Sequence, residues 1–331
     1  MSRNGIQRKK AGGSSKMVAM MAEAEKKVYE GDFKSAKSLL EVILKATPKN
    51  LHALDLFAKG ATDAGDAQTA IKILKHAISI DPKTYHRWMD LAQIQDGVTA
   101  LKCYRQGLAL MEEALKTVAG AAGADQKTMQ TIRVEMASGY ASVAELFVTD
   151  LCDENGAEKE CEKAVGAALR VCSQSPEANY AAANLRYIQG RGQDAAPHLG
   201  TCVNSLKSGN FNSTYEFRMN VAQLCFEMGN LEAALDITEG LLEEDNRIVQ
   251  TWYFASLCYF RAGDLATANE YLQRAVAMLK KAPQRELMAA CEELHEEMRK
   301  AAQGSAEQSQ QRGGGRSSSE GGAEGMEQET S

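Results

Sequence analysis

The chain has 331 residues, of which 44% are hydrophobic and 25% are charged, which is typical of a soluble protein with a sizeable core. The scarcity of proline (5 residues) and the alanine-rich periodic stretches favour helices. No segment approaches the run of about 20 apolar residues that a membrane span needs, and the basic start does not resemble a signal peptide.

The charges are unevenly placed along the chain. Residues 1–16 carry five basic and no acidic side chains, and residues 303–331 have a net charge of −3. Because the net charge of the whole chain is −6, residues 17–302 must have a net charge of −8. An acidic body suggests a basic partner and argues against a nucleic-acid groove or direct nucleic-acid binding. The alternative is an acidic surface that is merely solvated.

The eight cysteines indicate a reducing compartment, cytosol or nucleus. No two of them have the CxxC spacing, and most lie among apolar residues at helical spacing, where a free cysteine behaves as a small hydrophobe.

In chain order, the sequence begins with a basic Gly/Ser-bearing segment, residues 1–16, which we expect to be a disordered arm. A repeat with a period of 34 residues follows. Its turn has a glycine and, five residues later, an alanine: Gly31 and Ala36, Gly65 and Ala70, Gly229 and Ala234, Gly263 and Ala268. The alanines are expected where paired helices approach to about 8–10 Å.

The middle of the chain is less regular. A third repeat begins at Tyr85, and the small-residue stretch 117–127 predicts a loop or helix break. The pattern resumes near Thr128, and a helix is predicted over 157–171 before the Ser-Pro at 175–176. Residues 284–303 form an amphipathic pattern that predicts a capping helix, with its glutamate pairs on a solvated face.

This period is typical of tetratricopeptide helix–turn–helix repeats. The sequence therefore predicts an all-α, right-handed α-solenoid of about seven helix pairs over residues 17–302, ending in the capping helix. Residues 303–331 are predicted to be a disordered acidic tail rich in Gly, Ser and Glu.

Catalytic and cofactor motifs are missing from the sequence. There is no Walker loop, GxGxxG, GxSxG or HExxH pattern. His198 and Cys202 are four residues apart on one predicted helix, but two ligands are too few for a structural zinc. We therefore expect that the protein is not an enzyme and that it has no catalytic residue, cofactor or metal site.

In repeats of this type the first helix of each pair lines the concave side. Projecting the repeat positions along the chain predicts a partner-binding groove of acids, amides and tyrosines, with Lys59 also on this side. The predicted groove residues are Asp55, Asp90, Glu145, Asp150, Tyr180, Asn184, Tyr187, Glu216, Asn220, Glu227 and Tyr253. Acids would pair with the Arg and Lys of a guest, and tyrosine rings would accept guanidinium stacking.

One stretch is more specific than the repeat. The sequence AELFVTDLC at Ala144–Cys152, followed by AEKECE at Ala157–Glu162, resembles the signature of the dedicated assembly chaperones of the fourth large-subunit ribosomal protein. Ser175–Ala178 and the pattern from Trp88 to Gly107 are also similar to that family, and the likeness covers about residues 17–300.

The resemblance implies a function. Such chaperones are tetratricopeptide solenoids whose concave face holds the basic internal loop of the newly made ribosomal protein. They prevent its aggregation and accompany it to nuclear pre-60S assembly, so the expected location is cytoplasmic and nuclear, with a nuclear import receptor as a further partner. The acidic body fits a basic guest independently.

Two other functions compete with this one. The chain could be a scaffold or adaptor subunit of a larger protein complex, without any ribosomal protein. It could also be an RNA-associated protein that uses its basic arm, which an acidic groove disfavours.

Overall fold

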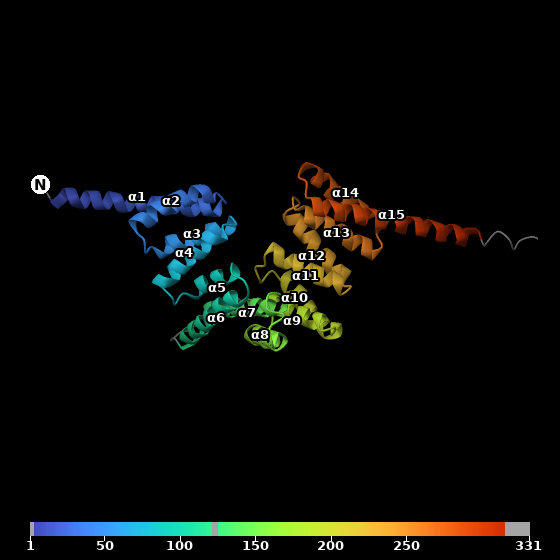
Figure 1. Cartoon of the computed structure of the whole chain (residues 1–331), viewed down its shortest axis with the longest axis horizontal. Helices are drawn as coiled ribbons and strands as arrows, with labels where there is room; N and C mark the ends of the chain where they lie inside the picture. Colours follow the sequence, from blue (N-terminus) through green and yellow to red (C-terminus); the bar gives the residue numbers. More distant parts are fainter. Residues whose placement is uncertain (1–2, 121–124, 315–331) are drawn as a thin grey trace, which may run out of the picture. The chain divides into compact units, whose positions relative to one another are not determined.

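The computed structural model describes residues 3–120 and 125–314, and Figure 1 shows that all the regular structure in these ranges is α-helical. The helices are α1 (Arg3–Tyr29), α2 (Phe33–Ala46), α3 (Leu51–Asp63), α4 (Ala67–Ile80), α5 (Tyr85–Gln93), α6 (Gly97–Gly120), α7 (Gln126–Val148), α8 (Ala157–Val171), α9 (Pro176–Ile188), α10 (Gly192–Lys207), α11 (Tyr215–Glu227), α12 (Leu231–Glu244), α13 (Val249–Ala262), α14 (Leu265–Lys281) and α15 (Arg285–Gly314). Each odd-numbered helix up to α13 packs against the even-numbered helix that follows it.

The 34-residue repeat is visible in the backbone of the turns between paired helices. The four repeat glycines adopt left-handed conformations, with φ of +77°, +75°, +78° and +87° at Gly31, Gly65, Gly229 and Gly263. The residue after each glycine caps the next helix: Asp32, Asp66, Asn230 and Asp264 accept a hydrogen bond from the amide three residues on. A glycine followed by a capping side chain therefore ends one helix and starts the next.

The small residues lie where the sequence places them, in the contact between paired helices. Ala36, Ala70, Ala234 and Ala268 have no solvent exposure. Leu40, Leu74 and Leu272, each four residues further along the same helices, are also buried and complete the apolar stripe of the second helix.

The chain divides into two compact units, residues 1–211 and 212–331. In the second unit, α15 covers the end of the helix stack. Its Cys291, Leu294 and Met298 are buried in one cluster with Leu272 and Leu279 of α14. The helix thus has the capping role that its amphipathic pattern indicates.

The structure differs from the sequence-based expectations in three segments. α6 continues to Gly120 through the first part of the predicted 117–127 loop, and residues 121–124 lie outside the described residues. α1 begins at Arg3 and α15 extends to Gly314, so residues 3–16 and 304–314 are helical where disorder was expected. Each segment continues a helix that is packed elsewhere along its length. Because the hydrogen bonds of a helix are formed within its own backbone, the helix can extend through a segment that has no apolar face. The tail from 315 onward lies outside the described residues.

Two further observations concern the described residues. None of their helices has the length and apolarity that crossing a membrane requires. All eight cysteines are free thiols, and every one except Cys152 is buried.

The turn glycines give a testable expectation for stability. Gly65→Ala places a Cβ in open space but in the left-handed region, so we expect the substitution to destabilise the fold by about 1 kcal/mol. Gly200→Ala is the matched control, because Gly200 lies inside α10 with open space around it, and alanine there should stabilise by about 0.5–1 kcal/mol. Thermal unfolding followed by circular dichroism measures both, and shifts of equal sign would contradict the assignment.

Candidate partner-binding surface

The predicted groove residues lie on the first helices of their pairs, with one exception. Asp55 is on α3, Asp90 on α5, Glu145 on α7, three residues are on α9, three on α11 and Tyr253 on α13. Asp150 is the exception, because it lies in the turn after α7. Its Oδ2 accepts a hydrogen bond from the Gly97 amide (2.9 Å) at the start of α6, so this carboxylate connects two helix pairs.

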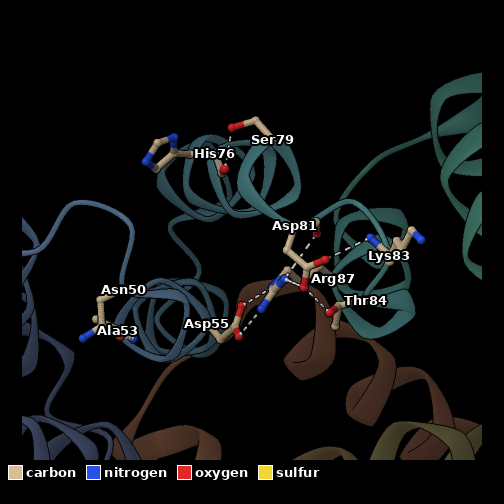
Figure 2. Close-up of polar contacts among 9 residues, drawn as sticks. All are labelled: Asn50, Ala53, Asp55, His76, Ser79, Asp81, Lys83, Thr84 and Arg87. Atoms are coloured by element: carbon tan, nitrogen blue, oxygen red, sulfur yellow. Dashed lines mark hydrogen bonds and ion pairs between the residues drawn. The ribbon is translucent and has the colours of Figure 1, made fainter.

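Asp55 has a partner within the chain, which the sequence did not reveal. The guanidinium of Arg87 donates from Nε to Asp55 Oδ1 (2.7 Å) and from Nη2 to Asp55 Oδ2 (2.9 Å), as Figure 2 shows. Arg87 Nη1 also donates to Asp81 Oδ2 (3.0 Å), and the side chain is 7% exposed. Asp55 is therefore neutralised by a buried arginine of the next repeat.

Asp81 completes this network at the end of α4. Thr84 Oγ1 donates to its Oδ2 (2.6 Å) and the Lys83 amide donates to its Oδ1 (3.2 Å), as is also visible in Figure 2. These two hydrogen bonds, together with that from Arg87, lower the pKa of the Asp81 carboxyl. The carboxylate stays ionised and fixes the turn between α4 and α5.

Asp90 and Glu145 have the opposite electrostatic character. Both side chains reach solvent, yet the protein around them displaces enough water to raise the pKa of each carboxyl; at Glu145 the charge of Asp150 adds to the effect. Within the described residues neither carboxylate has an ion pair or a hydrogen bond to a protein group. The fold therefore leaves these two acids without an ion-paired counter-ion.

α9 contributes an aromatic and amide surface. Tyr180 and Asn184 are half-buried, whereas Tyr187 is exposed, with 36% of its area accessible. The adjacent Ile188 is 57% exposed. Apolar side chains exposed at the end of a first helix are suited to contacts with a partner.

The second unit has its own acidic and aromatic residues. Glu216, Asn220 and Glu227 are exposed along α11, while Tyr253 of α13 is half-buried. Burial, with Cys291 and the carboxylates Glu293 and Glu297 of α15, raises the pKa of the Tyr253 hydroxyl.

The sequence analysis missed Glu293 and Glu297 as neighbours of Tyr253, because glutamate pairs on a capping helix look like a solvated face. A usable signal was the role of α15 itself: a helix that packs against α13 stands where the first helix of an eighth pair would stand. In the structure Asp55 lies near Asp90 and Asp150 lies near Glu145. In addition to desolvation, the charge of Asp55 raises the pKa of Asp90, and the charge of Asp150 raises the pKa of Glu145. Tyr253 lies near α15, whose glutamates add to the effect of burial in raising the pKa of its hydroxyl.

No group of three or more His, Cys, Asp or Glu in the described part of the chain is arranged to hold a metal ion. The His198 ring instead faces an amide, with 3.4 Å between its Nδ1 and Asn179 Oδ1.

Comparison with known proteins supports the resemblance seen in the sequence. The chain is 27% identical over 260 residues to a protein of Schizosaccharomyces pombe named "Probable assembly chaperone of rpl4", covering 75% of each chain. A protein of the same name from Emericella nidulans is 23% identical over 238 residues, 67% of this chain and 58% of that one. Both relatives are thus named as probable assembly chaperones. No protein-family model matches the chain.

The fold has counterparts among solved structures. A structure named "Assembly Chaperone of RpL4 (Acl4)" superposes with a TM-score of 0.63 at 21% sequence identity, covering 75% of this chain and 97% of that one. The Cut9 and Hcn1 complex of the APC/C matches with a TM-score of 0.50 at 10% identity, covering 82% of this chain and 47% of that one. At these identities the likenesses show the fold alone, and the chain is a tetratricopeptide-type solenoid as the repeat predicted.

The Arg87 network gives a second testable expectation. Arg87→Met keeps much of the apolar packing and removes the charge, so we expect a destabilisation of about 2 kcal/mol. This is below the 3–5 kcal/mol typical of broken buried pairs, because the remaining carboxylates are partly exposed and regain water. Urea unfolding of the variant and the wild type measures the difference.

Arg247→Met is the matched control, since the Arg247 side chain is 85% exposed and its pair with Asp245 should contribute little. Equal effects of both substitutions would contradict a structural role for Arg87.

The network also has a pH dependence, whose sign follows from the lowered pKa of Asp81. The stabilisation that Asp81 contributes is present above the unfolded pKa of about 4 and is lost as the pH falls through the lower folded value.

Proposed function

We propose that this protein is a dedicated chaperone of the newly made fourth large-subunit ribosomal protein. The observation that carries the proposal is the 27% identity, over three quarters of both chains, with a protein named as an assembly chaperone of rpl4. In this proposal the chain binds the basic internal loop of its guest on the first helices, prevents aggregation and accompanies it from the cytoplasm into the nucleus for pre-60S assembly, with an import receptor as a further partner.

The chemistry of the first helices supports a basic guest. Asp90, Glu145, Glu216 and Glu227 are exposed carboxylates on α5, α7 and α11 that form no ion pair among the described residues. Tyr187 and Tyr253 provide ring faces on α9 and α13 for guanidinium stacking. Charge pairs and stacking favour binding, and the ordering of a flexible guest loop offsets part of the gain.

The test is mild affinity purification of the tagged protein from its native cells, with mass spectrometry of stoichiometric partners. We expect one basic large-subunit ribosomal protein, free of mature ribosomes, to dominate. A stable multi-subunit complex without ribosomal proteins would overturn the proposal in favour of the scaffold function.

The electrostatic mechanism predicts a charge-reversal effect in the second unit. Glu216→Lys combined with Glu227→Lys should weaken binding of the purified ribosomal protein at least tenfold, because two attractive charges on α11 become repulsive. Binding of the wild type should also weaken steeply between about 0.1 and 0.5 M salt. Fluorescence anisotropy of the labelled ribosomal protein measures both effects.

Glu243→Lys is the control variant, because Glu243 is exposed on α12, the second helix of the same pair. It changes the net charge in the same direction without touching a first helix, and should alter affinity little. An affinity insensitive to salt, or an equal loss with Glu243→Lys, would count against binding along α11.

A further inference from the structure

A small recess lies between α3 and α5 in the first unit, and the sequence analysis did not identify it. Lys59, Thr62 and Asp63 of α3 form one side, and Asp90 and Gln93 of α5 form the other. The buried side chains of Ala58 and Leu74 form an apolar floor. The recess encloses about 220 Å³, which is below the roughly 300–1,000 Å³ of sites for whole small molecules and suits a single long side chain.

The charges around the recess leave one carboxylate without a counter-ion. Lys59 Nζ bonds Asp63 Oδ2 at 3.0 Å, and Asp55 is bound by Arg87. The charged or titratable groups that act on Asp90 are His86 and Arg87 of α5 and Asp55 and Lys59 of α3. With Asp81, which also pairs with Arg87, four carboxylates share two permanent cations, and Asp90 is the one that forms an ion pair with neither.

Asp90 is held in surroundings that disfavour its charge. Its side chain is exposed, yet the surrounding protein partly desolvates the carboxyl and raises its pKa, as expected for a group that lines a recess. An incoming cation would restore the missing counter-charge, and it would do so in a partly desolvated place where a charge-assisted hydrogen bond is strong.

On the basis of the proposed function, we propose that this recess is a subsite for one arginine side chain of the basic guest. The alkyl part of an arginine fits the floor of Ala58 and Leu74, and its guanidinium has donors for the Asp90 carboxylate, the Gln93 amide oxygen and the Thr62 hydroxyl. A guanidinium is more weakly hydrated than an ammonium and presents a planar fork to a carboxylate. Lys59 already supplies the ammonium that Asp63 needs, which leaves Asp90 for the guest.

The first experiment measures the affinity of the purified fourth large-subunit ribosomal protein for the full chain carrying Asp90→Asn. This substitution keeps the shape and removes the charge, so binding should weaken about ten- to a hundredfold. Glu41→Gln is the matched control, an exposed acid on α2, and should leave affinity unchanged. Equal affinities of Asp90→Asn and wild type would overturn the subsite while leaving the proposed function intact.

Thermal unfolding separates a binding role from a structural one. Because the folded pKa of Asp90 is raised, its charged form lowers the stability at pH 7, and this cost disappears below the unfolded pKa. Asp90→Asn should therefore melt at the same temperature as the wild type or higher. Weaker binding accompanied by a clear fall in melting temperature would overturn the inference.

The guest side chain is identified by a double-mutant cycle. Arginines in the basic segment of the ribosomal protein are replaced by lysine one at a time and tested against wild type and Asp90→Asn. We expect one replacement to weaken binding about tenfold against the wild type but hardly at all against Asp90→Asn. Coupling to no arginine would overturn the proposal, and failure of the wild-type chain to bind the ribosomal protein at all would overturn the proposed function with it.

Discussion

The close approach of two helices within each pair is the constraint on which the rest of this structure depends. A fully buried alanine near the start of the second helix allows that approach in the regular repeats, as at Ala36, Ala70, Ala234 and Ala268. The left-handed glycine and capping side chain just before it fix the direction in which the second helix leaves the turn. Because these few positions supply the packing within each pair, the face of the first helix that does not contact the second helix is not needed for packing and can carry charged side chains.

The same positions explain why the fold was predictable from the sequence. Glycine in a turn, a cap beside it and alanine at a fixed distance are local signals, each with its own physical cause, and they repeat every 34 residues. The helix predicted over 157–171 coincides with α8, because a glycine before it and Ser175-Pro176 after it mark both ends. The continuation of α6 through the first part of the 117–127 segment was missed because alanine-rich sequence with scattered glycine is compatible with both a loop and a helix end.

The partners of the side chains on the candidate surface could not be predicted from the sequence, for a physical reason. The helix that carries each residue follows from the repeat, and ten of the eleven predicted residues lie on first helices. Whether a carboxylate is free depends on what the neighbouring repeat brings to it. Arg87 is 32 residues from Asp55, and Gly97 is 53 residues before Asp150, so both pairings depend on how adjacent helix pairs stack. Nothing in the local sequence distinguishes an arginine that will be buried from one on a solvated face.

The structure consequently sorts its acids into two groups that the net charge of the chain conceals. At the starts of second helices, hydrogen bonds from the side chain and amide three residues on lower the pKa of Asp32, Asp66 and Asp264, and these carboxylates stabilise the fold as they stand. On first helices, the surrounding protein partly desolvates the exposed Asp90 and Glu145 and raises the pKa of each carboxyl, so the charge of these two acids does not stabilise the isolated chain. A cation from a partner would lower these raised pKa values and remove a cost that the free protein bears, so part of the binding free energy would come from relief within the protein itself. Under the proposed function, selectivity for a basic guest would then arise at particular carboxylates rather than over the whole acidic surface.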